Sequence, residues 1–383
     1  MDRKPLAYKR IVIKFGTSLL TGGSDRLDAE IMSGLAAQVA AVHEQGAEVV
    51  IVTSGAVAAG RQCIKANHSL KGVPLRQVLA AVGQARLMKT YEEIFEKHNI
   101  TVAQALLTKT DITDRSGYLN ARNTFMSLLE IGIVGIVNEN DVVAVDELVE
   151  SRFGDNDNLS AMVANLVDAD LLIILTDIAG LYTADPHLHP EACLIPEVSD
   201  INSAIDAMVG DTSGKLGTGG MLTKIEAARL ATASGVAVII AGGRENEVIT
   251  RLARGEAIGT RFVPAASKLE SRERWMLAGL CTKGRLLIDD GAAAALTEQN
   301  KSLLPAGVKE VRGEWERGDI VDICNMGGVR IATGITNYSS KDAASLKGVR
   351  SGQITQHLGY DYGAEMIHRN NMVLIHRRTD GAG

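Results

Sequence analysis

The chain has 383 residues, of which 46% are hydrophobic, and its 40 Lys plus Arg against 46 Asp plus Glu give a net charge of −6. This length predicts two or three domains with sizeable cores, and the charge balance argues against a broadly cationic protein that coats nucleic acid. Thirty-nine glycines with seven prolines and 4% aromatic residues favour a compact α/β enzyme over an all-β module or a disordered chain.

The sequence shows no sign of export or of a membrane span. Its charged start, MDRKPLAYKR, leads straight into an apolar strand-like run without a signal-type core, and no apolar run approaches the ~18 residues of a span. The cysteines have no metal-ligand or disulfide-framework spacing. We therefore expect a cytoplasmic protein with reduced thiols and no membrane partner. The cysteines are Cys63, Cys193, Cys281 and Cys324.

Short apolar runs alternate with helical patterns in the first part of the chain. In the first helical pattern Leu27, Leu35 and Val42 share one face, and Gly46 follows as a stop signal. This alternation predicts an α/β fold with three layers, in which helices cover both faces of a largely parallel sheet and ligands bind at the carboxyl ends of the strands. The predicted strands are 11–15, 49–52, 102–107, 133–137, 171–175 and 236–240.

The periodicity changes after residue 260, where Pro, small residues and mixed charges replace the strand–helix alternation. Beyond this point short strands and the turn Met326-Gly327-Gly328 predict a small β-rich domain with a hairpin. We predict a first domain over 1–266, a linker over 267–282 and a second domain over 283–383. The expected elements of the second are a strand at 286–289, a helix at 291–296, and strands at 320–325 and 329–335.

Polar residues follow several of the predicted strands. Lys14-Phe15-Gly16-Thr17-Ser18 offers a cation and backbone N–H groups to an anion, although a solvated lysine would look the same. Thr53-Ser54-Gly55-Ala56 suits a carboxylate or a phosphate, or forms an ordinary tight turn. Asn138-Glu139-Asn140-Asp141 places four polar side chains where such a sheet binds ligands, and Asp141 could pair with an ammonium group.

Two further segments border predicted helices. Gly154-Asp155-Asn156-Asp157-Asn158 precedes a helix expected near Leu159; one N-cap would explain only one of these residues, and the EF-hand order is absent. The glycine-rich stretch Gly217–Lys224 opens another helix and forms an anion site with its N–H groups and lysine. It is not a Walker A loop, because Leu216 stands where Ser or Thr must hold magnesium.

Together, Lys14, Lys224, the glycine N–H groups and the carboxylates are typical of phosphoryl transfer without a covalent nucleophile. In such reactions the protein aligns donor and acceptor and neutralises the moving phosphoryl group. Mg²⁺ bound through the phosphates of ATP would complete the site.

Seven motifs in this order resemble the glutamate 5-kinase family of the amino-acid kinase superfamily, over nearly the whole chain. The residues after 283 resemble a PUA module in G-R-L-L-I-D-D-G-A-A-A-A-L, S-L-L-P-A-G-V and G-D-I-V-D-I-C-N. The seven motifs are K-F-G-T-S, V-T-S-G-A-V-A-A-G-R, V-L-A-A-V-G-Q, V-N-E-N-D, G-D-N-D-N-L-S-A, L-T-D-I-A-G-L-Y-T-A-D-P and K-L-G-T-G-G-M-L-T-K.

The resemblance implies the amino-acid kinase fold, transfer of the ATP γ-phosphoryl group to the side-chain carboxylate of L-glutamate as the first step of proline synthesis, inhibition by proline, and a homo-oligomer. Lys14 and Lys224 would then stabilise the phosphoryl group, and Asp157 would orient them. Ser54, Asp141 and Asn156 would bind glutamate. The ATP site would comprise Lys14, Thr176, Asp177, Thr218, Gly219, Gly220, Met221, Leu222, Thr223 and Lys224.

Three alternatives stay open at this point. Another kinase of the superfamily could act on aspartate, N-acetylglutamate, carbamate or UMP. A PUA module could bind RNA, although residues 283–383 carry 13 Lys plus Arg against 12 Asp plus Glu, a weak footprint for a phosphate backbone. A non-catalytic amino-acid sensor would not need both lysines. The segment 145–153 looks longer and more acidic than the family pattern.

Overall fold

The computed structural model describes residues 5–64, 71–144, 156–186, 188–210, 220–264 and 282–375. The chain divides into two compact units, Met1–Ile112 with Ala121–Lys268 and Thr113–Asn120 with Leu269–Gly383. Two expected features, the acidic loop 145–153 and the linker apart from Thr282, lie outside the described residues. In the described ranges no helix combines the length and the hydropathy that crossing a bilayer requires.

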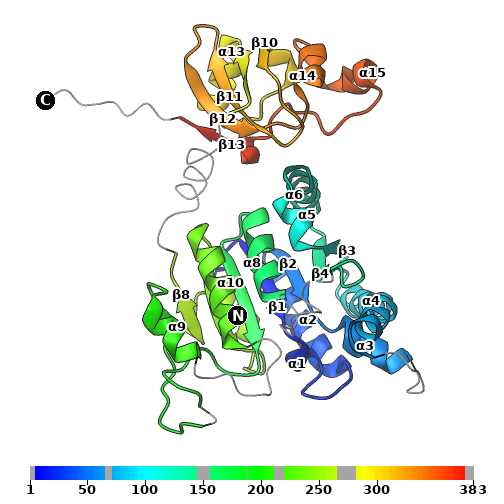
Figure 1. The fold of residues 1–383 in the computed structure, drawn as a ribbon, viewed down its shortest axis with the longest axis vertical. Helices are drawn as coiled ribbons and strands as arrows, with labels where there is room; N and C mark the ends of the chain where they lie inside the picture. Colours follow the sequence, from blue (N-terminus) through cyan, green and yellow to red (C-terminus); the bar gives the residue numbers. More distant parts are fainter. Residues whose placement is uncertain are drawn as a thin grey trace, which may run out of the picture. The chain divides into compact units, whose positions relative to one another are not determined.

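The first unit contains an eight-stranded sheet in the order β3-β4-β2-β1-β5-β7-β8-β6 (Figure 1). Every neighbouring pair is parallel except β7 and β8, so the prediction of a largely parallel sheet is confirmed. Each predicted apolar run is a strand. The strands are β1 (Arg10–Phe15), β2 (Glu48–Thr53), β3 (Val102–Leu107), β4 (Val134–Glu139), β5 (Leu171–Thr176), β6 (Glu197–Val198), β7 (Ala237–Gly242) and β8 (Thr260–Phe262).

Helices cover both faces of this sheet. On one face α2 packs against α4 and α11, and on the other α8 packs against α10. Figure 1 labels α2, α4, α8 and α10. The helices are α1 (Thr17–Leu20), α2 (Ala29–His43), α3 (Ala56–Cys63), α4 (Gly72–Glu96), α5 (Lys109–Thr113), α6 (Arg115–Glu130), α8 (Asn156–Leu166), α9 (Ser203–Gly210), α10 (Met221–Ala233) and α11 (Val248–Ala253).

The alternation of side chains along β1 decides which face its lysine occupies. Ile11, Ile13 and Phe15 belong to the buried cluster formed with α2, α4 and α11. Because successive side chains of a strand point to opposite faces, Lys14 lies on the other face, which α8 covers. A single lysine in the strand RIVIKF is thereby placed beneath a helix at the carboxyl edge of the sheet.

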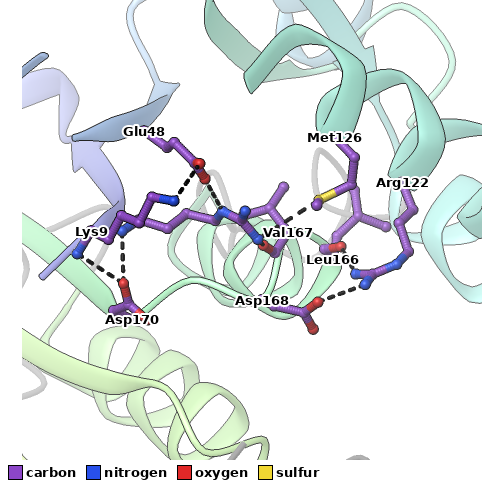
Figure 2. A network of polar contacts seen from close by, with 9 residues as sticks. Lys9, Glu48, Arg122, Met126, Leu166, Val167, Asp168 and Asp170 are labelled. Atoms are coloured by element: carbon purple, nitrogen blue, oxygen red, sulfur yellow. Dashed lines mark hydrogen bonds and ion pairs between the residues drawn. The ribbon is translucent and has the colours of Figure 1, made fainter. Parts of the chain in front are cut away.

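The C-terminal end of α8 is held by two arginines, in the network that Figure 2 shows. Arg122 of α6 donates to the Leu166 carbonyl and, at 2.6 Å, to Asp168 Oδ2; Arg10 of β1 donates to the Val167 carbonyl. These are carbonyls that a helix end leaves without an intrahelical partner, and a guanidinium also suits the negative end of the helix dipole. The end of α8 opposite to Asp157 is therefore fixed by charged hydrogen bonds.

The second unit is built on a five-stranded sheet in the order β10-β9-β11-β12-β13. The predicted hairpin is present, because β11 and β12 pair antiparallel across the turn at 326–328. Trp315, Tyr338 and Met366 lie in its core. Its elements are β9 (Gly284–Ile288), α13 (Asp290–Thr297), η1 (Pro305–Gly307), β10 (Val308–Gly313), β11 (Ile320–Asn325), β12 (Arg330–Ile335), α14 (Ser340–Leu346), η2 (Ser351–Gln353), α15 (Ile354–Leu358), η3 (Arg369–Asn371) and β13 (Met372–Leu374).

Candidate active site

Two lysines from distant parts of the first unit meet at one carboxylate. Lys14 Nζ, near the end of β1, lies 2.6 Å from Asp157 Oδ1, and Lys224 Nζ, in the first turn of α10, lies 3.3 Å from Asp157 Oδ2. All three side chains are buried. The structure thus brings together the three residues predicted from the sequence to handle the phosphoryl group.

The charges in this cluster do not cancel. Burial by itself would raise the pKa of Asp157, but the two lysines outweigh it and hold that pKa below its usual value. Burial lowers the pKa of Lys224, and Lys14 lowers it further against the attraction of Asp157. Within these three side chains, one carboxylate between two ammonium groups leaves one positive charge in excess, and Asp177 acts on Lys224 as a further negative charge of smaller effect; water screens these charges poorly.

The site residues of α8 lie inside the helix rather than in a turn before it. The expected start near Leu159 is wrong, because α8 begins at Asn156 and its first turn includes Asp157. The Ser160 hydroxyl donates to the Asp157 carbonyl at 2.5 Å. Runs of Asn and Asp favour turns when only local propensity is considered, whereas here their side chains are bound by residues from other elements.

The N-terminus of α10 completes the positive side of the cluster. Gly220 is the N-cap, and Thr223 Oγ1 lies 2.7 Å from Asp157 Oδ2 and 2.9 Å from the Gly220 carbonyl. The first N–H groups of a helix have no intrahelical partner, and in α10 those of Met221 and Leu222 lie at the positive end of the helix dipole. The predicted ATP residues Thr218 and Gly219 lie outside the described residues.

The two residues predicted after β5 lie at the carboxyl edge of the same sheet. Thr176 is the last residue of β5 and is buried, and its hydroxyl donates to Asp177 Oδ1 at 2.9 Å. Strand β5 is the direct neighbour of β1, which carries Lys14. The predicted ATP residues therefore come from adjacent strand ends and from the start of α10.

The predicted substrate residues Ser54 and Asn156 are in direct contact. Asn156 Nδ2 donates to Ser54 Oγ at 3.0 Å and lies 3.2 Å from Asn138 Oδ1. All three side chains are buried at the carboxyl ends of β2 and β4 and at the start of α8. Asp141 lies in the turn that follows β4, and there the Val142 carbonyl accepts from Gln77 of α4 at 3.2 Å.

Two buried amides lie next to this contact: Asn138 was predicted only as one of four polar side chains after a strand, and Gln84 was not predicted at all. Asn138 Nδ2 donates to Gln84 Oε1 at 2.8 Å, so the hydrogen-bonded row that begins at Ser54 and Asn156 continues to Gln84. The signal for Gln84 was present in the sequence: it shares a helical face with Leu87 and Tyr91, which are apolar in character and buried. A polar residue on a buried helix face indicates a partner or a ligand.

This arrangement can bind and transfer an anionic group. Two lysines and a helix N-terminus converge on one point, small residues let ligands approach the strand ends, and no side chain in the described ranges is set up as a covalent nucleophile with a base. Nor are three Asp, Glu, His or Cys side chains grouped there so as to hold a metal ion. The fold and this cluster define a phosphotransferase of the amino-acid kinase type.

Comparisons with known proteins give the same class and narrow it. The profile of the Amino acid kinase family matches residues 9–242, and the PUA domain profile matches residues 284–358. A glutamate 5-kinase from Dehalococcoides mccartyi strain CBDB1 is 58% identical over 96% of this chain and 99% of its own length. A glutamate 5-kinase from Herpetosiphon aurantiacus is 51% identical over 97% of this chain and 100% of its own length. One from Geobacter sp. strain M21 is 46% identical over 96% of this chain and 98% of its own length. The chain belongs to the glutamate 5-kinase family, as its seven motifs predicted.

Proposed function

We propose that this protein transfers the γ-phosphoryl group of ATP to the side-chain carboxylate of L-glutamate, giving L-glutamyl 5-phosphate for proline synthesis. The observation that carries the proposal is the convergence of Lys14 and Lys224 on Asp157, next to the buried contact between Ser54 and Asn156. The names of the relatives support glutamate as the acceptor.

The chemistry fits a site without a general base. A glutamate side chain has a reference pKa near ~4.3, so its carboxylate is already ionised at neutral pH and can attack directly. A carboxylate oxygen forms a bond to the γ-phosphorus while the bond from that phosphorus to the β–γ bridging oxygen breaks and ADP leaves. Repulsion between the anionic acceptor and the polyphosphate is the main obstacle. The positive charge of Lys14, Lys224 and the α10 N-terminus opposes this repulsion.

Magnesium fits this site as part of the nucleotide. Both oxygens of Asp157 face lysine ammonium groups, and the described residues offer no other group of carboxylates for a resident ion. Mg²⁺ is commonly held by substrate phosphates with few protein ligands. We therefore treat MgATP as the co-substrate, with Thr176, Asp177 and Gly220–Lys224 as the described part of its site.

The direct test is a product assay with purified protein, MgATP and L-glutamate in the presence of hydroxylamine, which traps the labile acyl phosphate. We expect ADP and glutamyl hydroxamate to form in equal amounts. L-Aspartate, N-acetyl-L-glutamate and UMP replace glutamate in parallel reactions. ADP release without glutamyl hydroxamate, or faster turnover of one of these competitors, would overturn the acceptor assignment.

Asp141 distinguishes a free amino acid from an N-acetylated one, because only the free amino acid carries an ammonium group to pair with a carboxylate. We expect Asp141→Ala to raise the KM for glutamate at least about tenfold, the scale of one lost charged hydrogen bond, with little change in the KM for ATP. Asp25→Ala, at an exposed aspartate before α2, is the control. Equal effects of Asp141→Ala on both KM values would contradict this role.

We propose that proline inhibits the enzyme at the same subsite. Proline carries the α-carboxylate and α-ammonium of glutamate but no side-chain carboxylate, so it could occupy the amino-acid end of the pocket without accepting a phosphoryl group. We expect proline to raise the KM for glutamate and to leave kcat unchanged. Inhibition that glutamate cannot overcome would place proline elsewhere.

Homo-oligomer formation and the domain boundaries 1–266, 267–282 and 283–383 stay predictions.

A further inference from the structure

A row of four buried polar side chains runs from Ser54 to Gln84, and one backbone group fixes its direction. The Glu139 N–H donates to Asn138 Oδ1 at 2.9 Å, which identifies that atom as the oxygen of its amide. Asn138 therefore points its Nδ2 toward Gln84, and Asn156 points its Nδ2 toward Asn138 Oδ1 and Ser54. Rotating any of these amides by 180° would set two donors or two acceptors against each other.

Fixing the amides in this way leaves one atom at each of two positions without a partner. Gln84 Nε2 and Asn156 Oδ1 are buried, and neither has a hydrogen-bond partner among the described residues. The two side chains belong to residues that are only 9% and 7% exposed. A buried amide atom that lacks a partner costs about 1–3 kcal/mol, so a donor and an acceptor of this kind next to a substrate subsite point to a ligand that pairs with them.

The position of Gln84 depends on the close packing of helices α3 and α4. A Cβ atom on Gly83 would lie 1.8 Å from the Ala56 carbonyl oxygen, and one on Gly60 would lie 2.0 Å from the Leu79 carbonyl oxygen. Only glycines allow α3 and α4 to pack backbone to backbone in this way. One turn and two turns after Gln84, Leu87 and Tyr91 anchor the same face of α4, where Tyr91 OH lies 2.7 Å from Thr53 Oγ1 at the end of β2.

We propose that Gln84 is a specificity-determining residue of the amino-acid subsite and that its Nε2 donates to the α-carboxylate of the substrate. This inference rests on the proposed function. The order of contacts indicates which substrate carboxylate Gln84 binds. Both lysines contact Asp157, whose neighbour in sequence is Asn156. Asn156 contacts Asn138, and Asn138 in turn contacts Gln84. The side-chain carboxylate must reach the lysines, so the α-carboxylate is the one left for the opposite end. Asn156 Oδ1 then accepts from the ammonium group.

Two substitutions separate a ligand from a residue that merely positions Asn138. Gln84→Glu keeps the size and the Oε1 acceptor for Asn138, and replaces only the free donor by a carboxylate oxygen. Gln84→Met removes both the donor and the acceptor. Gln104→Glu and Gln104→Met, at an exposed position of β3, are the matched controls.

The readout is the KM for L-glutamate and the preference for L-glutamate over 4-aminobutyrate, which keeps the ammonium and the reactive carboxylate but lacks the α-carboxylate. If Nε2 binds the α-carboxylate, Gln84→Glu raises the KM for glutamate at least about tenfold, reduces the preference by a similar factor and leaves the KM for ATP within about twofold. The KM defect grows as pH rises, because the introduced carboxyl group can still donate while it is protonated.

Two results would overturn the inference. Near-wild-type glutamate kinetics in Gln84→Glu with a defect in Gln84→Met would mean that Gln84 only positions Asn138. An unchanged preference over 4-aminobutyrate would mean that it does not contact the α-carboxylate. Failure of the proposed function would look different, since the wild-type protein itself would then form no glutamyl hydroxamate. Circular dichroism and thermal melts of each variant identify any loss that comes from unfolding.

Discussion

Lys14 Nζ lies 2.6 Å from Asp157 Oδ1, so the carboxyl end of β1 and the N-terminal turn of α8 are joined by a buried ion pair. The other ends of the same two elements are joined as well, because Arg10 at the start of β1 donates to the Val167 carbonyl just beyond α8. The helix therefore crosses the face of the sheet with both ends attached. This attachment places Asp157 where it can also contact Lys224.

Asp157→Asn should leave the two lysines in place without their shared counter-charge. We expect kcat to fall by about 10²-fold or more, since both ammonium groups lose the acceptor that orients them. The free energy of unfolding should also fall, by about 3 kcal/mol, because a buried ion pair broken on one side leaves uncompensated charge. Steady-state kinetics and urea unfolding measure the two effects. A variant with full kcat would show that Asp157 does not orient the lysines.

The pH profile of kcat should report the lowered pKa of Lys224. Phosphoryl transfer needs the ammonium form of Lys224. Because the pKa of Lys224 is lowered, kcat should begin to fall, as pH rises, at a pH lower than the ordinary lysine pKa of ~10.4. In Lys224→Arg the residual activity should extend to higher pH, because a guanidinium keeps its charge there. An alkaline limb at the same pH in both proteins would contradict the assignment.

Stability should respond to pH on the acid side through Asp157. Its pKa is lower in the folded protein than in the unfolded chain, so the stabilisation it gives is present above the unfolded value of ~3.9 and is lost as pH falls through and below that value. Urea unfolding between about pH 6 and pH 3 should therefore show a smaller loss in Asp157→Asn than in the wild type. Equal slopes in both proteins would show that Asp157 makes no such contribution.

Gly83→Ala tests the close packing of α3 on α4. Its Cβ would meet the Ala56 carbonyl oxygen at 1.8 Å, which backbone atoms cannot relieve without moving one helix. We expect a loss of about 3 kcal/mol in the free energy of unfolding. Gly34→Ala, at a glycine of α2 whose Cβ would meet nothing within 4 Å, should be neutral or stabilise by up to about 1 kcal/mol. Similar results at both positions would refute the close contact.

Arg122→Met tests whether the hydrogen bonds of Arg122 at the C-terminal end of α8 affect the candidate active site at the N-terminal end of this helix. The variant loses the donors to the Leu166 carbonyl and to Asp168, and we expect about 1–3 kcal/mol lower stability. Because α8 then gains freedom, kcat should fall several-fold at a temperature where the variant stays folded. Arg251→Met, which removes an arginine bound to Glu256 and to the Asn246 carbonyl, is the control. Unchanged kcat in Arg122→Met would show that these hydrogen bonds contribute to stability and not to catalysis.

Much of the fold could be predicted from sequence because its signals are local. A six-residue apolar run such as LLIILT has the length of a buried strand and is too short for an ordinary helix, and Gly46, with a φ of +90°, follows its helix as the predicted stop signal. The site was harder. Lys14 lies near the end of a recognisable strand and Lys224 near the start of a recognisable helix, so both could be predicted. The start of α8 at Asn156 depends instead on partners from the ends of β2 and β4 and from α10, which no local sequence pattern contains. Gln84 shares a helical face with Leu87 and Tyr91, which marks it as a buried polar residue, but which of its atoms lacks a partner depends on the orientation of Asn138, and the sequence does not give that orientation.

The central claim is that Lys14 and Lys224 act on one migrating phosphoryl group. The most direct measurement is the rate of glutamyl hydroxamate formation by Lys14→Met and Lys224→Met at saturating MgATP and glutamate, with Lys89→Met, an exposed lysine of α4, as the control. We predict that each site variant loses about 10²–10³-fold in kcat while Lys89→Met keeps the wild-type rate. Full activity in either site variant, with its fold intact, would contradict the account.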